Sequence, residues 1–499
     1  MNGNRPESVR RVVALDELGP EVAGLLGEGF RLALVAAHDE EATIRVVYLL
    51  TAGNPDRRVE LHLSTGSDNP MVPTLAPISF PGSRFEREMR DLFGIEPVGH
   101  PQPARLVLHQ HWPDGWLPMR RGSGSAPPMD PETRPFPFTP VEGNGIYEIP
   151  VGPVHAGMIE PAHFRFFVVG ETVISMKARL WFVHRGVERL FEGRTPGQGV
   201  DLAERISGDT AVGHAWAYSA AVEDATGIAM PPEANLLRAI LLELERIYNH
   251  VADIGALAND VGFGIINAHT NRVRERLLRL NAQVSGHRLL RDGVGVGGVS
   301  LIGLPSRSEL DEVAAEVAEI VDLTFGQNTL VDRFTGTSVL SPERAAEIGT
   351  LGYVARASGQ SLDARTSHPV APSLYDGLVV PVLSDGDVMA RAKIRVGEFE
   401  ASIGLLRRLL DRCGSKLDWR VAVPDNLSGL RSGVGIIEGW RGSIVHRVEL
   451  TGNNLSRVKV VDPSFMNWPA LRISMAETIV PDFPLTNKSF NLSYAGNDL

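Results

Sequence analysis

The chain has 499 residues, 43% hydrophobic and 22% charged, which is the composition of a globular protein with room for two or three domains. Its formal net charge of −11 argues against binding nucleic acid or an anionic membrane through a basic patch. Cys413 is the single cysteine, which excludes an internal disulfide, a thiolate zinc finger and an iron–sulfur cluster held by this chain alone. No apolar leader and no long uncharged apolar run is visible, so we expect a cytoplasmic protein without a signal peptide or membrane span.

The first part of the chain is predicted to be a small sheet domain. Residues 31–38, 42–51 and 58–65 are apolar runs separated by short polar breaks, which predicts a strand meander. Residues 84–93 then form a short amphipathic helix that ends at Gly94.

A motif on this helix resembles the 30-kDa subunit of respiratory complex I. Residues 86–95 read Glu-Arg-Glu-x-x-Asp-x-Phe-Gly-Ile, and residues 99–101 read Gly-His-Pro, as in that family. The resemblance implies a domain used for assembly. A charged helix lying on a sheet, without catalytic chemistry, is the expected role.

A linker follows. Residues 122–128 are rich in glycine, serine and proline, and proline-rich chain continues to residue 140. We therefore divide the chain into a first domain at residues 1–121, a linker at 122–140 and a second domain at 141–499.

The second domain is predicted to open with a hairpin and to be mainly helical afterwards. Strands are expected at residues 164–170 and 172–182, with a helix starting near His184. Apolar residues then recur at three- and four-residue steps from Leu237 to Val261, which indicates a long helix with one buried face.

Three further helices complete a predicted bundle. One is expected at residues 271–290 and another at residues 387–410. The third is expected to begin at a capping box formed by Ser306 and Glu309. The glycine-rich residues 293–298 lack a Walker lysine and are predicted to form a turn rather than a nucleotide site. The expected fold class is therefore α+β, with a small sheet domain ahead of a helix bundle.

Two stretches of the second domain resemble the large subunit of NiFe hydrogenases. Residues 205–210 read Arg-Ile-Ser-Gly-Asp-Thr, where that family has Arg-Ile-Cys-Gly-x-Cys, and residues 491–499 match its Asp-Pro-Cys-x-x-Cys end. The four cysteine positions of the family hold Ser207, Thr210, Ser493 and Gly496. The order of the two domains is similar to the fused large subunits of formate hydrogenlyase-type (group 4) hydrogenases, and the second domain also resembles the 49-kDa subunit of complex I.

This resemblance implies the frame of a metal site without its ligands. A nickel–iron centre needs soft, deprotonated thiolates, which hydroxyl groups and glycine cannot supply. We therefore expect no nickel–iron centre. For Glu188 two interpretations remain: a magnesium ligand, as the resemblance implies, or an ion pair with Arg185 or Arg189 at helical spacing.

In the complex I family the corresponding cavity is the head of a quinone tunnel. A tyrosine and a histidine hydrogen-bond the quinone there, because both can donate a proton to it. The tyrosine position holds Gly208, and the histidine position on the opening loop matches His155. A second loop histidine falls at Ile159, with His163 as a nearby alternative, and Asp260 matches the carboxylate that pairs with the histidine.

The resemblance implies roles for four more residues. Glu160 occupies the Ile-Glu-Pro position that group 4 hydrogenases use for proton passage. Arg185 and Arg205 match arginines beside the terminal iron–sulfur cluster of the neighbouring small subunit, where a cation raises the reduction potential; carboxylate pairing is the alternative. Arg441 lies in a Glu-x-Pro-Arg-Gly-like stretch. The candidates are thus His155, Glu160 and Asp260 for catalysis, and His163, Arg185, Arg205 and Arg441 for cofactor contact.

For His155 and His214 the alternative is a structural role, in which the histidine lies in a loop or in the core and makes its hydrogen bonds within the protein.

Two functions follow from the resemblance. The first is a peripheral subunit, on the cytoplasmic side of the membrane, of a complex I-like or formate hydrogenlyase-like oxidoreductase. Electrons from a partner's [4Fe–4S] cluster would reduce a quinone-like acceptor or be coupled to ion translocation. The expected partners are a complex I 20-kDa-like iron–sulfur subunit, a ferredoxin-like subunit, antiporter-like and anchor membrane subunits, and a formate or NADH dehydrogenase unit as donor. The second function is a catalytically inert scaffold of such a complex.

Overall fold

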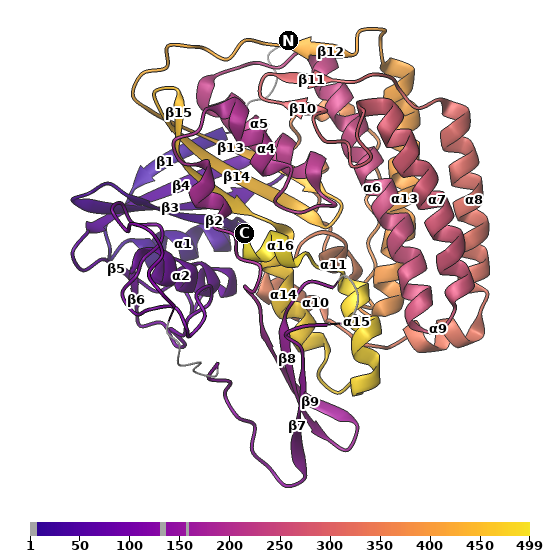
Figure 1. Ribbon diagram of the computed structural model, residues 1–499, viewed down its shortest axis with the longest axis horizontal. Helices are drawn as coiled ribbons and strands as arrows, with labels where there is room; N and C mark the ends of the chain where they lie inside the picture. The colour runs from indigo at the N-terminus through magenta and orange to yellow at the C-terminus, as the bar shows by residue number, and fades with distance from the viewer. Residues whose placement is uncertain (1–6, 130–135, 156–158) are drawn as a thin grey trace.

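The computed structural model describes residues 7–129, 136–155 and 159–499 (Figure 1). The first domain is a four-stranded sheet in the order β1-β4-β3-β2. Its strands are β1 (Glu7–Val12), β2 (Arg31–Asp39), β3 (Thr43–Ala52) and β4 (Arg57–Gly66). Strands β2 to β4 are the predicted antiparallel meander, and β1 adds a parallel edge to β4.

Two helices, α1 (Leu18–Gly27) and α2 (Phe80–Phe93), belong to this domain, together with the short parallel pair β5 (Met71–Pro73) and β6 (Glu96–Val98). Helix α2 begins after Ser79, whose hydroxyl accepts the Gly82 N–H at 3.1 Å, and it ends at Gly94 with φ of 73°. Asp91, from the motif on α2, accepts the N–H groups of Leu106, Val107 and Leu108 through one oxygen. The motif therefore fixes the chain that follows the helix.

The second domain opens with a three-stranded sheet and continues as the predicted bundle. The sheet consists of β7 (Ile146–Val151), β8 (His163–Val169) and β9 (Thr172–Arg179). Short helices follow: α3 (Val187–Phe191), α4 (Pro196–Ala203) and α5 (Ala211–Thr226). The bundle itself contains α6 (Pro232–Asp260), α7 (Gly264–Ser285), α8 (Arg307–Phe325) and α13 (Val388–Arg412). The α+β fold class and the order of the two parts are thus confirmed.

The rest of the second domain is built from shorter elements. The glycine-rich residues 293–298 belong to a small hairpin, in which a turn at residues 296–297 joins β10 (Val294–Gly295) to β11 (Gly298–Ser300). Strand β12 (Asp418–Arg420) pairs with β11. The other short helices are α9 (Asn328–Phe334), α10 (Pro342–Ile348), α11 (Gly352–Ala357), α12 (Ala364–Ser367), η1 (Pro372–Leu374) and η2 (Val480–Asp482). None of the helices in the described part of the chain is both long and apolar enough to cross a bilayer.

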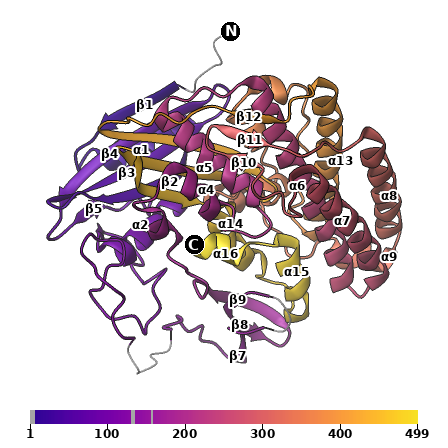
Figure 2. The ribbon, with the colours of Figure 1, turned by 45° about the horizontal axis from the view of Figure 1, so that its top comes forward.

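Another three-stranded sheet, which the sequence did not indicate, lies between the first domain and the bundle (Figure 2). It consists of β13 (Leu430–Gly439), β14 (Gly442–Thr451) and β15 (Asn454–Val461). Helix α5 packs directly on β13 because Gly433 and Gly435 lack side chains: a Cβ there would lie 2.3 and 2.0 Å from the backbone oxygens of Ala221 and Ala217. The chain ends with α14 (Pro463–Ser474), α15 (Phe483–Phe490) and α16 (Tyr494–Asp498), and α16 lies at the centre of the molecule (Figure 1).

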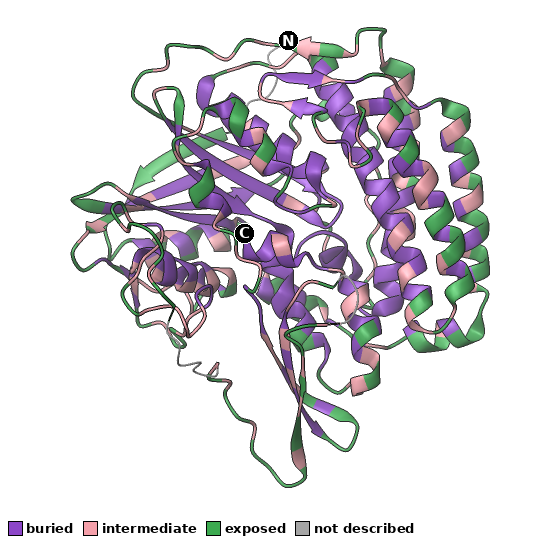
Figure 3. Ribbon diagram, viewed as in Figure 1, coloured by how far each residue is buried: buried purple, intermediate pink, exposed green. Residues whose placement is uncertain are grey.

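The two domains meet through buried ion pairs. Arg45 donates to both oxygens of Glu449 at 3.1 and 2.9 Å, and Arg447 lies 2.9 Å from Glu60. Lys459 on β15 lies 2.6 Å from Glu88, which belongs to the motif on α2. Figure 3 shows that the strands on both sides of this contact are largely buried.

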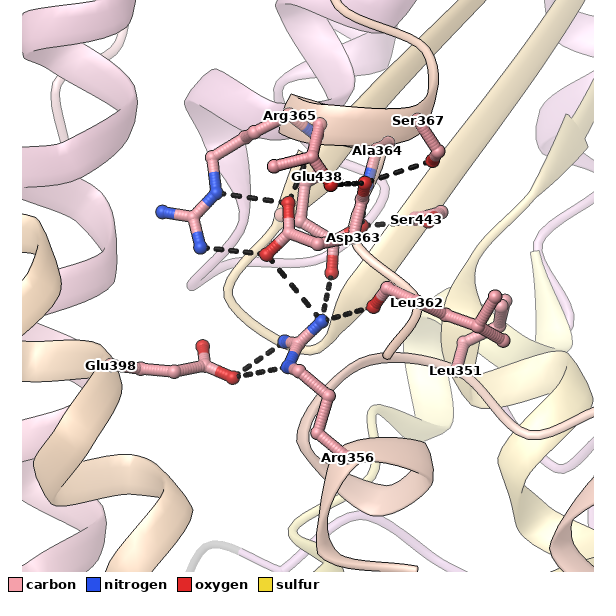
Figure 4. Close-up of polar contacts among 12 residues, drawn as sticks. Leu351, Arg356, Leu362, Asp363, Ala364, Arg365, Ser367, Glu398, Glu438 and Ser443 are labelled. Carbon is pink, nitrogen blue, oxygen red and sulfur yellow. Dashed lines mark hydrogen bonds and ion pairs between the residues drawn. The ribbon is translucent and has the colours of Figure 1, made fainter. Parts of the chain in front are cut away.

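A second buried charge network connects the bundle to β13 (Figure 4). Arg356 binds Glu398 and Glu438, while Arg365 binds Asp363 at 2.7 Å. All of these side chains are buried, so each guanidinium has a carboxylate partner that compensates for its lost hydration. Glu438 of this network lies on β13, and residues 440 and 441 follow the end of that strand.

Candidate functional site

The four positions that the resemblance aligns with hydrogenase cysteines come together. Ser207 and Thr210 precede α5, and Ser493 is the N-cap of α16. The hydroxyl oxygens of Ser207 and Ser493 are 2.9 Å apart, although these residues are 286 positions apart in the chain. The Gly496 N–H donates to the Ser493 hydroxyl at 2.9 Å. The frame expected from the two motifs is therefore present.

An ion pair lies in the middle of this frame. Both terminal nitrogens of Arg441 donate to the carboxylate of Asp209, at 2.6 and 2.8 Å. The Ser207 and Thr210 hydroxyls donate to the same carboxylate, at 3.1 Å each. Burial opposes ionisation of Asp209, but Arg441 and the hydroxyl groups lower its pKa overall. The guanidinium also lies 3.9 Å from the Trp440 ring centroid, which fixes its orientation.

The fourth position is closed by Asp462. A Cβ on Gly496 would lie 2.6 Å from Cγ and Oδ2 of Asp462, so any side chain at residue 496 would displace this carboxylate. Asp462 in turn lies 3.0 Å from Nε2 of His214, and Nδ1 of His214 lies 3.0 Å from Nε2 of His446. His214 is fully buried and has partners on both nitrogens, so it is the satisfied core histidine of the alternative interpretation.

These contacts test whether a nickel–iron centre fits. The hydroxyls of Ser207 and Thr210 are hydrogen-bonded to Asp209, and the Asp462 carboxylate occupies the space beside residue 496. A serine or threonine hydroxyl remains protonated near neutral pH and is a poor ligand for a soft metal. The residues present do not fit the group.

Two buried carboxyl groups near the frame have strongly raised pKa values. Burial raises the pKa of Glu245 on α6 to about 8, although its oxygens accept the N–H groups of Val212 and Gly213 at 2.7 and 3.1 Å. Burial also raises the pKa of Asp498 on α16 to about 6. Both groups can hold or release a proton near neutral pH. Sequence reasoning missed them, and the one available signal for Glu245 was an acid within the predicted apolar stretch of α6.

Glu160 and Arg185 lie at the edge of the frame. Glu160 accepts the Ala495 N–H at 3.2 Å, which ties the opening loop to α16. Arg185 donates to the carbonyls of Arg205 and Ile206 at 2.9 and 2.7 Å, so it holds the segment that precedes Ser207. Arg205 itself is exposed and lies 3.7 Å from Asp201 and 3.8 Å from Glu204, in agreement with the carboxylate-pairing alternative.

Among the described residues, no hydrogen bond or ion pair joins the side chains of the three remaining candidates. His155 is half-buried, with Nε2 2.9 Å from the Ala162 carbonyl. His163 packs edge-on against Phe138 with ring centroids 5.4 Å apart. Asp260 is the last residue of α6, and burial raises its pKa. Among the described residues no hydrogen bond or ion pair joins Asp260 to His155, and residues 156–158 of the opening loop lie outside the described residues.

Glu188 has different partners from those expected. Its carboxylate lies 2.7 Å from Arg457 and 3.0 Å from Lys459, and it accepts the Val460 N–H at 3.0 Å. The predicted pair with Arg185 or Arg189 is therefore wrong, because β15 supplies the cations; Arg189 pairs with Glu192 instead. Burial alone would raise the pKa of the Glu188 carboxyl, but these cations lower it to about 2. Magnesium does not fit this carboxylate, because the two cations occupy its oxygens.

A groove of about 380 Å³ opens beside Arg185, between the two domains. Trp112 and Trp116, stacked with centroids 4.9 Å apart, form one wall, and Arg185 and Leu499 line the other. The groove thus combines an apolar wall with a cation that contacts the frame.

Three families of known proteins match parts of this chain. The family described as the respiratory-chain NADH dehydrogenase 30 Kd subunit matches residues 18–126, and that of the 49 Kd subunit matches residues 260–427. The family described as nickel-dependent hydrogenase matches residues 185–258, which include Ser207 and Thr210.

Among curated proteins, formate hydrogenlyase subunit 5 of Escherichia coli (strain K12) is 32% identical, over 96% of this chain and 87% of that protein. The carbon monoxide-induced hydrogenase of Rhodospirillum rubrum is 33% identical, over 69% of this chain and 97% of that protein. An NADH-quinone oxidoreductase subunit of Bacteroides fragilis is 27% identical, over 84% of this chain and 85% of that protein. One chain in a structure of the membrane-bound sulfane sulfur reductase, an archaeal respiratory membrane complex, has the same fold, with a TM-score of 0.66 and 24% identity over 72% of this chain and all of that chain.

Proposed function

Since the chain belongs to the family of fused complex I 30-kDa and 49-kDa-like subunits that includes formate hydrogenlyase large subunits, we propose that it acts in a membrane-associated oxidoreductase complex. The frame around Ser207 and Ser493 would lie next to the iron–sulfur cluster of a partner subunit. That cluster would deliver electrons to a quinone-like acceptor, or its reduction would be coupled to ion translocation. The groove beside Arg185 offers the partner an apolar surface.

The observation that carries this proposal is the convergence of hydroxyl groups and proton-handling groups within one frame. Around the converged hydroxyls lie the Asp209–Arg441 ion pair, the Asp462–His214 pair and Glu245. Reduction of a quinone-like acceptor, or charging of a nearby cluster, adds negative charge that protons must balance. With a pKa raised to about 8 by burial, Glu245 is protonated at neutral pH and can release its proton toward such a charge.

The loop residues have a matching role in the proposal. Glu160 contacts α16 and stands between the opening loop and the frame, so it can pass a proton between them. His155 presents an imidazole on the same loop, with Nε2 donating to the Ala162 carbonyl. It would donate a hydrogen bond to the acceptor through Nδ1 in its doubly protonated form. Arg185 and Arg441 would hold the local backbone and the central carboxylate in place.

A scaffold function is the second candidate, because the centre of the frame is already filled. The Asp209–Arg441 ion pair and the Ser207–Ser493 hydrogen bond leave these polar groups with partners inside the chain. A subunit kept only for its interfaces would have such a self-satisfied site.

Purification of the native complex, with metal analysis and titration by a quinone analogue, separates the alternatives. We expect no stoichiometric nickel and saturable binding of the analogue, lost in His155→Ala and kept in His269→Ala, which alters an exposed histidine of α7. Absence of analogue binding by the intact complex would favour the scaffold. Stoichiometric nickel would overturn the assignment of the frame.

A further inference from the structure

A pocket of about 410 Å³ lies where α2, β9 and α14 meet. It adjoins the frame, because the indole of its lining residue Trp468 donates to the Ser493 carbonyl at 3.3 Å. In Figure 1 these elements can be followed from the first domain through the β7–β9 sheet to the C-terminal helices. Five cationic side chains line the pocket: Arg84, Arg87, Lys177, Arg179 and Arg472. Its described lining contains no aspartate or glutamate. This is unexpected in a chain with a net charge of −11.

Two of these cations are occupied by the protein itself. Arg87 donates to the carbonyls of Ala104 and Arg105 at 2.8 and 3.1 Å, and Arg179 donates to those of Val107 and Leu108 at 3.3 and 2.9 Å. They therefore contribute positive potential and fix the wall, but most of their donors are used.

The other three have donors to spare. Arg84 makes one long contact, 3.5 Å to the Asn497 side chain, and its buried Nε has no hydrogen-bond partner among the described residues. Within the same part of the chain, neither Lys177 nor Arg472 has a carboxylate within ion-pair distance or a side-chain hydrogen bond. Three unpaired cations therefore share one pocket.

The positive charges of the cationic side chains in this pocket repel one another. Burial, with Arg87 and Arg472 nearby, lowers the pKa of Arg84 to about 9. Burial and Arg472 also lower the pKa of Lys177. Elsewhere in the chain the buried guanidiniums of Arg238, Arg356 and Arg447 face carboxylates. Arg472 is exposed and Arg84 and Lys177 are half-buried, so water reduces their mutual repulsion, and an anion bound between them would remove more of it.

The walls between the cations are aromatic. Phe80, Phe136, Phe138, Trp181 and Trp468 line the pocket, and the Arg84 guanidinium stacks over Phe465 behind it, 4.6 Å from the ring centroid. The volume exceeds what an inorganic oxyanion fills and suits a small organic molecule. Arginine forks bind phosphate oxygens in a bidentate manner, and lysine adds a point charge.

We propose that this pocket binds a phosphate monoester, with Arg84, Lys177 and Arg472 on the phosphate and the aromatic walls against its organic group. No step of the proposed redox function uses this pocket, so the two proposals fail separately.

Isothermal titration of the purified full-length chain with phenyl phosphate, in a low-chloride buffer, tests the proposal. We expect saturable binding with one site per chain, at least about tenfold tighter than that of inorganic phosphate, because only the ester also covers the aromatic walls. The double variant Lys177→Gln/Arg472→Gln should weaken binding at least about tenfold, since two charge-assisted contacts are lost. Both residues lack protein partners among the described residues, so the fold should tolerate the change.

The matched control is Lys393→Gln/Arg408→Gln, which removes the same charge from two exposed positions of α13. It should bind like the wild type. Three results would overturn the proposal: no saturable binding by the wild type, equal binding by the pocket variant, or equal loss in the control. Equal affinity for phenyl phosphate and inorganic phosphate would overturn the assignment of the aromatic walls.

Discussion

Replacing Gly496 by alanine tests the most constrained contact of the frame. The new Cβ would lie 2.6 Å from Cγ and Oδ2 of Asp462, a distance that cannot be kept. Asp462 is buried, accepts the Ser464 N–H at 2.7 Å and pairs with His214, so it has no free direction in which to move. Loss of the carboxylate partner of a buried group costs about 3–5 kcal/mol, and the better helix propensity of alanine returns up to about 1 kcal/mol. We therefore expect a net destabilisation of about 2–4 kcal/mol.

The assay is guanidinium unfolding followed by tryptophan fluorescence, with Gly208→Ala as the control. Gly208 lies in the same frame, but a Cβ added there would have no atom within 4 Å, so its substitution should change the free energy of unfolding by no more than about 0.5 kcal/mol. The double variant Gly496→Ala/Asp462→Ala should cost less than the sum of the single changes, because the clash disappears with the carboxylate. Equal midpoints for Gly496→Ala and Gly208→Ala, or strict additivity in the double variant, would refute the reasoning.

Three further predictions concern buried charge. Lys459→Met leaves Glu88 and Glu188 buried without their shared cation, so it should cost about 3–5 kcal/mol in denaturant unfolding, against little change for the exposed control Lys393→Met. The pairing of Glu188 lowers its pKa to about 2, so the stability that this ion pair adds to the fold is complete above the ordinary pKa of 4.5 and is lost as pH falls toward 2. The variant Glu188→Gln should therefore melt at a lower temperature than the wild type, and this difference should shrink as pH falls over that range. A difference that stays constant would contradict this. Burial raises the pKa of Glu245 to about 8, so the wild type loses stability as pH rises from 4.5 to 8. The melting temperature of Glu245→Gln should therefore rise relative to that of the wild type between pH 5 and pH 9. Parallel pH profiles for the two proteins would disprove the raised pKa of Glu245.

The sequence predicts the elements whose signals are local. Helix α6 follows from its apolar periodicity, and α8 begins where the Ser306 and Glu309 capping box indicates. Strand β1 was missed because all of its side chains are exposed and most are polar. Strand β13 was missed because Gly433 and Gly435 are typical of a loop in sequence, and only the close approach of α5 explains them.

The candidate site also contains some features that the sequence predicts and others that it does not. Motif spacing predicted that Ser207 and Ser493 would meet, because it fixes which positions share a frame. The partners of Glu188 were not predictable from spacing, since Arg457 lies 269 positions away on another element. Asp462 was missed for a related reason: its role depends on the empty volume at Gly496, which no local pattern reveals.

The ion pairs between the domains have a consequence for how the polypeptide can be divided. Arg45 with Glu449, Arg447 with Glu60, and Lys459 with Glu88 join surfaces that stay in contact without help from residues 122–129. A peptide-bond cleavage in that stretch would remove only the local concentration effect of a tether. Two separately translated halves should then assemble into the same particle, so that fusion or separation of the coding sequence becomes a neutral choice for this architecture.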